Sequence, residues 1–169
     1  MTVTVRLRAA TDLEACARLL VEVHRTDGYP VEGVAEPISW LTPGNAVEAW
    51  VGEVEGAVVG HALVCAATAA DDAARLWLER TAEPLTRVLA FGRLFVGTAG
   101  RNHGVGERLV RTAMAYATER DKRLVLDVMD KDRAAIRLYE RLGWQHIGMV
   151  THHFGEGRET GAQCYAAPS

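Results

Sequence analysis

The sequence has little of what marks disulfide scaffolds, membrane spans and nucleic-acid-binding surfaces. Its three cysteines, Cys16, Cys65 and Cys164, are odd in number and lack metal-ligand spacing, which predicts reduced thiols. No run approaches the roughly 20 apolar residues of a membrane span, and the first residues lack the apolar core of a signal peptide. Arginines are scattered and the formal net charge is −3, which argues against a general nucleic-acid binder. We therefore expect a cytoplasmic protein that binds neither nucleic acid nor membrane.

The composition that remains is that of an ordinary globular protein. Hydrophobic residues make up 49% of the 169 residues and charged residues 24%. Neither internal repeats nor low-complexity tracts are visible, and this length suits a single domain. We expect one domain that covers residues 1–169.

Apolar periodicity predicts strands that alternate with amphipathic helices. The first segment alternates apolar and polar residues, and Glu55-Gly56 is typical of a hairpin turn between two strands. Residues 69–87 are the least regular, with a short helix possible at 69–80, and 151–162 has the composition of a polar, glycine-rich loop. This order predicts a mixed α/β sheet with helices on both faces. We expect strands at 2–8, 47–54, 58–67, 88–96, 124–129, 144–150 and 163–167, and helices at about 12–27, 104–120 and 132–142.

The stretch Arg101-Asn-His-Gly104-Val-Gly106 lies between an expected strand and an expected helix. Glycines at a helix start let backbone N–H groups approach an anion closely, and the amides of the first turn lack helical partners. The helix dipole adds to the attraction for a phosphate. The stretch therefore predicts a seat for a pyrophosphate, although the pattern alone is short and also fits a plain tight turn.

Two blocks of the sequence resemble the GNAT superfamily of acetyl-CoA-dependent N-acetyltransferases. Leu94-Phe-Val96 followed by Arg101-x-x-Gly104-x-Gly106 is similar to the family's acetyl-CoA motif. The stretch from Asp132 through Ala135, Leu138-Tyr139 and Gly143-Trp144 is similar to its second block, Asn-x-x-Ala-x-x-Leu-Tyr-Glu-x-x-Gly-Phe. The blocks are in the expected order within residues 88–150, whereas the first half supplies no diagnostic motif.

The resemblance implies a mixed, mostly antiparallel sheet of about seven strands, in which one parallel pair splays apart. It implies acetyl-CoA as co-substrate and no metal. The pantetheine arm would pair with the backbone of Leu94, Phe95 and Val96. Arg101 could contact a phosphate, and Asp132 stands where the family usually has a cofactor-touching asparagine. The pyrophosphate would lie on the amides of Asn102, His103, Gly104, Val105 and Gly106.

The resemblance also assigns catalytic candidates. Tyr139 aligns with a tyrosine that protonates the departing thiolate in many members. The glutamate that many members carry on the fourth strand has no equivalent here. Asp127, which interrupts an apolar strand, is the expected general base, and we expect burial to raise its pKa. A structural role for Asp127 stays open, and His61 is the alternative base.

The amine acceptor is expected to contact the first helix, the loop after it and the last strands. Asp27 could attract a cationic amine, Tyr29 and Trp40 could form apolar walls, and His152 could contact the acceptor from the loop between the closing strands. His24, Trp50 and His153 are weaker candidates. The hypothesis is an N-acetyltransferase for a primary amine of a small molecule or peptide, acting through a ternary complex and possible as a homodimer. The alternative is an acyl-CoA-binding module that has lost turnover.

Overall fold

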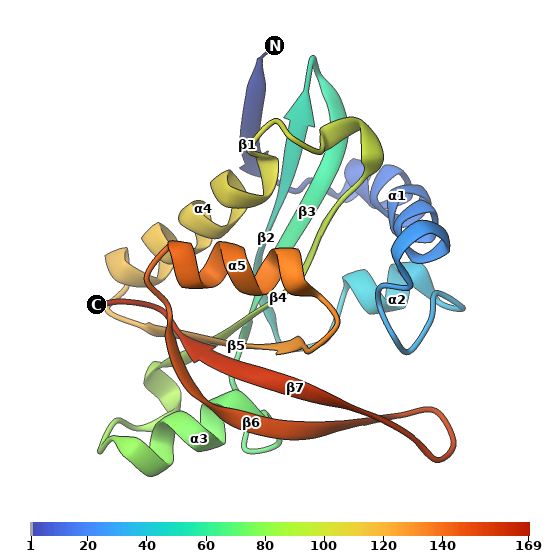
Figure 1. The fold of residues 1–169 in the computed structure, drawn as a ribbon. Coiled ribbons are helices and arrows are strands. Elements are labelled where there is room, and N and C mark those ends of the chain that lie inside the picture. The colour runs from blue at the N-terminus through green and yellow to red at the C-terminus, as the bar shows by residue number, and fades with distance from the viewer. Residues whose placement is uncertain (1) are drawn as a thin grey trace. The chain divides into compact units, whose positions relative to one another are not determined.

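The computed structural model describes residues 2–169, and its seven strands form one mixed sheet with helices packed on it (Figure 1). The strand order is β1-β2-β3-β4-β5-β7-β6. Strands β4 and β5 are parallel, whereas antiparallel register joins β1 to β2, β5 to β7 and β6 to β7. The expected mixed sheet of seven strands with one parallel pair is therefore confirmed.

The elements follow the expected order along the chain. The strands are β1 (Val3–Leu7), β2 (Ala46–Val54), β3 (Ala57–Ala66), β4 (Val88–Val96), β5 (Arg123–Met129), β6 (Gln145–Phe154) and β7 (Arg158–Ala166). The α-helices are α1 (Leu13–Asp27), α2 (Pro37–Leu41), α3 (Asp72–Arg80), α4 (Val105–Glu119) and α5 (Arg133–Arg141), and short 3-10 turns occupy Ala10–Asp12, Leu85–Arg87 and Thr98–Gly100.

Two predictions about these elements were wrong. The single turn of α2 was not expected, because five residues are too few to show helical periodicity. Most of the expected loop at 151–162 is strand, since β6 and β7 pair in register from Gln145↔Ala166 to Phe154↔Arg158. Backbone pairing sustains this hairpin although most of β6 is exposed or half-buried, so no apolar alternation signals it.

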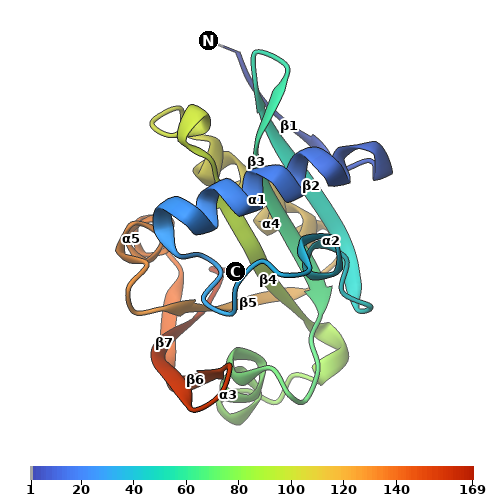
Figure 2. The ribbon, with the colours of Figure 1, turned by 90° about the vertical axis from the view of Figure 1, so that its right-hand side faces the viewer.

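The described residues group into two compact units. The first comprises residues 1–64 and 93–113. In this unit α1 crosses β2 and β3 (Figure 2) and buries Cys16, Leu20 and Val23 together with Leu41 of α2. On the opposite face Gly60 of β3 leaves room for α4, because a Cβ there would lie 2.9 Å from Val105 Cγ1. The first unit therefore packs helices on both faces of its strands.

The second unit comprises residues 65–92 and 114–169. In it α3 packs on the strands through Ala73, Ala74 and Trp77, against a core that includes Val125 of β5 and Cys164 of β7. Strand β4 contributes to both units, and the division falls at Arg93, whose φ of 53° is unusual for a residue other than glycine. The parallel register joins Val88–Ala90 of β4 to residues 123–125 of β5.

His61 of β3 is fully buried, and both of its ring nitrogens are engaged. Nε2 lies 2.9 Å from Arg8 Nη1, and Nδ1 lies 2.9 Å from the carbonyl oxygen of Arg93. Because arginine is only a donor, Nε2 accepts and Nδ1–H donates. Burial first, and then the charges of Arg8 and Arg93, lower the pKa of His61 to about 4. His61 is therefore a neutral structural group, which argues against its use as the alternative base.

The low pKa of His61 predicts a pH-dependent stability. His61 binds a proton near pH 6.5 in the unfolded chain but only near pH 4 in the folded chain. The free energy of unfolding is therefore highest above pH 6.5 and decreases as the pH falls from 6.5 toward 4. The difference corresponds to about 3 kcal/mol. Urea unfolding from pH 4 to 7 should show a shallower slope for His61→Asn than for wild type. His153→Asn, at an exposed position, should keep the wild-type slope. Equal slopes for His61→Asn and wild type would exclude His61 as the titrating group.

Candidate active site

The turn that links β4 to α4 contains two residues in the left-handed region. Asn102 has φ 64° and Gly104 has φ 74°. Gly100 just before it lies against β3, because a Cβ at Gly100 would be 2.7 Å from Val59 Cγ2. The fifteen residues of α4 then begin at Val105. The backbone thus packs closely against β3 at Gly100 and then adopts left-handed conformations at Asn102 and Gly104.

This geometry leaves a row of backbone amides without internal acceptors. Among the described residues, no amide from Asn102 to Gly106 donates to a backbone carbonyl, and the first such bond of the helix runs from Arg108 N to Gly104 O at 3.1 Å. These N–H groups stand at the positive end of α4. The five predicted pyrophosphate residues therefore form a continuous set of donors suited to an anion.

Arg101 and Asp27 form an ion pair in the first unit. Arg101 also donates from Nε to the carbonyl oxygen of Val96 at 3.3 Å. The predicted phosphate contact of Arg101 and the predicted amine contact of Asp27 therefore compete with this pair. Neither role follows from the structure, and both stay predictions.

The β4 residues expected to pair with pantetheine differ in what their side chains do. Phe95 is buried in the core of the first unit, stacked on His61 with ring centroids 5.1 Å apart. Leu94 and Val96 are half-buried. Because its ring belongs to the core, Phe95 can contribute only its backbone to the predicted pairing with pantetheine.

The expected acceptor residues Tyr29 and Trp40 lie together. Their rings meet edge to face with centroids 5.9 Å apart, and Trp40 also contacts Phe95 at 6.1 Å. Trp40 Nε1–H donates to Glu32 Oε1 at 3.0 Å. The two rings form a half-buried aromatic pair, and their role as apolar walls for the acceptor stays a prediction.

Tyr139 of α5 is buried in an aromatic cluster in the second unit. Its ring lies 5.4 Å from Trp144, 6.4 Å from Phe91 and 6.4 Å from Tyr165, measured between centroids. Burial chiefly, and then the carboxylates of Asp132 and Asp127, raise the pKa of the Tyr139 phenol. The phenol therefore keeps its proton throughout the neutral range.

Asp127 of β5 lies between the buried Leu126 and Val128, yet it is itself exposed, so its predicted burial was wrong. Protein nevertheless surrounds the carboxyl closely enough that loss of hydration raises its pKa, as predicted. The charges of Asp72 and Asp71 raise it further, while protonated His152 would lower it. Asp127 is therefore accessible, and its affinity for protons is higher than that of an ordinary aspartate.

The second unit brings four predicted residues within electrostatic reach of one another: the charges of Asp127 and Asp132 act on Tyr139, and that of His152 acts on Asp127. Asp132 is at the N-cap position of α5, where its side chain makes no capping hydrogen bond, and it lies 3.5 Å from Lys131 Nζ. His152 lies on β6, so its predicted place in a loop was wrong.

Two arginines near Trp40 were missed. Arg93 Nε donates to the carbonyl oxygen of Trp40 at 2.8 Å, and Arg8 Nη1 donates to that of Leu41 at 2.8 Å. Neither arginine belongs to a recognisable motif. The only available signal was an arginine within an otherwise apolar strand, Phe91-Gly-Arg93-Leu.

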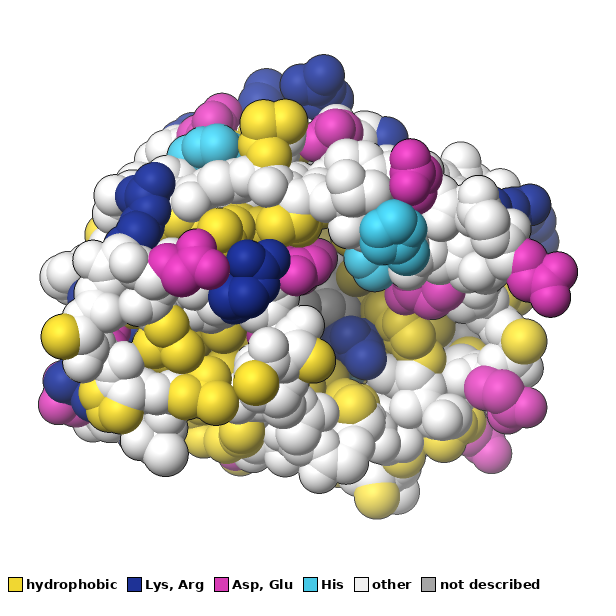
Figure 3. Space-filling model, turned by 90° about the horizontal axis from the view of Figure 1, so that it is seen from below, with side chains coloured by type: hydrophobic (Ala, Val, Ile, Leu, Met, Phe, Trp, Pro, Cys, Tyr) yellow, Lys and Arg dark blue, Asp and Glu magenta, His cyan; other side chains and the backbone are white. Residues whose placement is uncertain are grey.

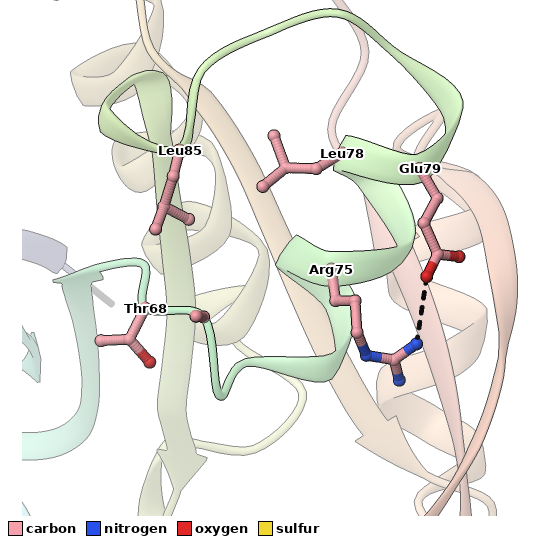
Figure 4. A pocket seen from close by; sticks show the side chains of 6 residues that line it. Thr68, Arg75, Leu78, Glu79 and Leu85 are labelled. Atoms are coloured by element: carbon pink, nitrogen blue, oxygen red, sulfur yellow. Dashed lines mark hydrogen bonds and ion pairs between the residues drawn. The ribbon is translucent and has the colours of Figure 1, made fainter.

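The second unit also contains a pocket that the sequence did not predict. Its volume is about 280 Å³, and Leu78 and Leu85 project into it while Arg75 pairs with Glu79 at its edge (Figure 4). In the view from below, hydrophobic side chains reach the surface among charged ones (Figure 3). None of the predicted catalytic residues lines this pocket. Its lining residues are Thr68, Ala69, Arg75, Leu78, Glu79 and Leu85.

Two other kinds of site are not found within residues 2–169. No group of three or more histidine, cysteine, aspartate or glutamate side chains could hold a metal ion. In the same part of the chain, no helix is both long and apolar enough to cross a membrane.

The sequence matches a known protein family over most of its length. The profile of the acetyltransferase (GNAT) family matches residues 13–144, which include the β4–α4 turn and most of the second block. The chain belongs to the GNAT acetyltransferase family. It is an acyltransferase, and the shared activity of its relatives is acetyl-CoA-dependent N-acetyl transfer.

Solved structures share the fold of this GNAT acetyltransferase over nearly its whole length. An N-acetyltransferase from Staphylococcus aureus Mu50 is 16% identical with a TM-score of 0.73, and 98% of each chain is covered. The ribosomal-protein-alanine N-acetyltransferase from Brucella melitensis is 19% identical with a TM-score of 0.74, over 96% of this chain and 98% of that one. Arabidopsis thaliana NAA60 in complex with acetyl-CoA is 18% identical with a TM-score of 0.72, over 98% of each chain.

Replacing Gly104 tests the anion seat of this GNAT acetyltransferase. Alanine at φ 74° is strained by about 1–2 kcal/mol. We expect Gly104→Ala to relax the turn, misalign the amides and weaken acetyl-CoA binding about tenfold, as measured by calorimetry. Gly56→Ala is a matched control, because Gly56 has φ 80° and equally open surroundings but lies in the β2–β3 turn. An unchanged affinity in Gly104→Ala, with a stability loss like that of Gly56→Ala, would contradict the assignment.

Proposed function

We propose that this GNAT acetyltransferase transfers the acetyl group of acetyl-CoA to a primary amine by direct attack in a ternary complex. The single observation that carries the proposal is the row of amides from Asn102 to Gly106 without internal backbone acceptors, in the family's acetyl-CoA motif. The proposal assigns the pyrophosphate to these amides and the pantetheine arm to the β4 backbone at 94–96. Among the described residues no cysteine forms a disulfide, which suits the reducing cytoplasm that we expect for the protein.

The reaction requires two proton movements. The lone pair of a neutral amine attacks the thioester carbonyl carbon, the C–N bond forms, and the C–S bond breaks with its electron pair going to sulfur. The amine nitrogen must lose a proton, and the departing thiolate must gain one. The products are an N-acetylated amine and free CoA thiol.

Asp127 is the proposed acceptor of the amine proton. Its accessibility lets an amine or a bridging water reach the carboxylate, and its raised pKa makes it a stronger base than an ordinary aspartate. Asp71, Asp72 and Asp127 together also give this region a negative charge that attracts a cationic amine. His152, close to Asp127, is proposed to contact the amine substrate.

Tyr139 is the proposed donor to the thioester sulfur. Because its raised pKa keeps the phenol protonated, Tyr139 is available as a hydrogen-bond donor at every pH at which the amine is reactive. The phenol gives its proton as negative charge develops on sulfur and recovers a proton from solvent. The rigid aromatic cluster with Trp144 and Phe91 holds the ring in place during this exchange.

Removing the Tyr139 hydroxyl tests the chemical step. We expect Tyr139→Phe to lower kcat by about 100-fold, within the range for loss of a general acid, with little change in the KM for acetyl-CoA. Acetyl-CoA-dependent thiol release across a panel of amines provides the measurement. Tyr116→Phe on α4 is the control and should keep wild-type kcat. If wild type releases no thiol with any amine while acetyl-CoA still raises its melting temperature, the chain is an acyl-CoA-binding module.

The role of Asp127 predicts the acidic limb of the pH profile. A general base must be ionised, so kcat/KM should fall as pH drops through the raised pKa of Asp127, above the usual value of 3.8. Asp127→Asn should lower kcat/KM by about 100-fold and remove this limb. At neutral pH the variant should be no less stable than wild type. A carboxyl group whose pKa is raised in the folded state is unfavourable for folding when it is ionised, and asparagine removes that charge. A variant with wild-type kcat/KM and an intact limb would exclude Asp127 as the base.

A further inference from the structure

Two half-buried arginines of the first unit, Arg8 and Arg93, lack an acidic partner. Other guanidinium groups, such as those of Arg6 and Arg101, pair with carboxylates. Within residues 2–169, no carboxylate lies within ion-pair distance of Arg8 or Arg93. Partial burial of a cation without a direct ion pair is unfavourable for folding. Burial lowers the pKa of Arg8 more than the more distant charges of Asp12 and Glu48 raise it. The two arginines are therefore poorly explained by stability alone.

Both guanidinium groups reach the carboxyl end of α2, and that of Arg8 also contacts His61. Arg8 Nη1 lies 2.9 Å from His61 Nε2 and donates to Leu41 O, while Arg93 Nε donates to Trp40 O. His61 also accepts no proton near neutral pH, so it adds no charge. Two cations thus lie at the end of α2, and the imidazole that contacts one of them is neutral.

Each arginine keeps donors that no described residue uses. The terminal nitrogens of Arg93 and the Nη2 and Nε atoms of Arg8 have no hydrogen-bond acceptor within residues 2–169. The Arg93 guanidinium carbon lies 4.8 Å from the centre of the Trp40 ring, a contact that restrains the orientation of the guanidinium. A planar, oriented guanidinium with unused donors matches the geometry of a carboxylate, which it binds through two parallel hydrogen bonds.

We propose that Arg8 and Arg93 bind a carboxylate of the acceptor, so that the acceptor is a primary amine that also carries a carboxylate group. This inference rests on the proposed acetyl transfer. The donor's pyrophosphate is already assigned to the amides of 102–106, whereas Arg93 contacts Trp40, which pairs with Tyr29, and these are the two aromatic residues expected beside the acceptor. An arginine pair at this place selects acceptors by charge, and Trp40 and Tyr29 select them by apolar contact.

A purely structural role makes a different prediction. If the arginines only satisfy the carbonyl oxygens of Trp40 and Leu41 at the end of α2, their removal lowers stability equally with every ligand. A carboxylate site instead predicts a loss of discrimination between a carboxylate and its neutral amide. The test must therefore measure discrimination rather than activity or stability alone.

The first arm of the test measures binding without turnover. Wild-type protein is titrated with N-acetyl amino acids and, in parallel, with the corresponding N-acetyl amino acid amides, with the Arg Nε–H and Trp indole N–H signals followed by NMR. We expect at least one carboxylate to bind about 10- to 100-fold more tightly than its amide and to shift the Arg93 and Trp40 signals. Arg93→Gln and Arg8→Gln should each abolish most of this preference. Arg93→Lys, which keeps the charge, should retain part of it.

Arg120→Gln is the matched control, because Arg120 is an exposed arginine that also lies on an aromatic ring, that of Tyr116. It should keep the full preference. Melting temperatures of all variants, measured without ligand, separate a loss of folding from a loss of recognition. Equal binding of every carboxylate and its amide to wild type would overturn the proposal, as would a preference that survives both Arg8→Gln and Arg93→Gln.

The second arm measures thiol release with free amino acids and amino acid amides as acceptors. A kcat/KM preference for the carboxylate that disappears in Arg93→Gln supports the proposal. Faster reaction of the amides, unchanged in the variant, overturns it. If no amine supports thiol release but the carboxylate preference in binding persists and depends on Arg93, acetyl transfer has failed as the function while the carboxylate site stands.

Discussion

The backbone of β4 at Arg93 is the constraint on which the first unit depends. Its φ of 53° interrupts regular strand geometry within an otherwise continuous strand. The carbonyl of Arg93 accepts from the neutral His61, and its side chain binds α2 through the carbonyl and ring of Trp40. One residue thus links β4 to β3 and to the helix that carries an expected acceptor residue. The low pKa of His61 follows chiefly from burial, which outweighs the opposing effect of this hydrogen bond.

Negative charge and limited hydration raise the pKa values of the catalytic candidates in the second unit. Asp127 and Asp132 both raise the pKa of Tyr139, and Asp71 and Asp72 raise that of Asp127. The two shifts suit opposite tasks, since one keeps a phenol protonated and the other strengthens a carboxylate as a base. In the first unit, by contrast, Arg8 and Arg93 have no carboxylate within ion-pair distance, and Asp12 and Glu48 act on Arg8 only from farther away.

Motifs and strong periodicity allowed much of the fold to be predicted, while the residues assigned to the acetyl donor stay predictions. Strand 88–96 has the predicted bounds, and the turn before α4 has amides without helical partners, as expected of a helix start. Weak local signals account for the errors. Helix α2 is too short to show a period, and β6 lacks a buried face, which misplaced His152 in a loop. Asp127 was expected to be buried because its neighbours in sequence are apolar, but it faces outward between them.

The sequence by itself determined the family and predicted acetyl-CoA as the donor, because both depend on residues close together in the chain: the turn at 101–106 and the block from Asp132 to Trp144. Only the tertiary structure brought Arg8, Trp40, His61 and Arg93 together, since they come from separate segments of the sequence. It also decided that Arg101 pairs with Asp27 and that Asp127 is accessible. Contacts between distant segments and exposure to solvent depend on packing, and no local pattern encodes them.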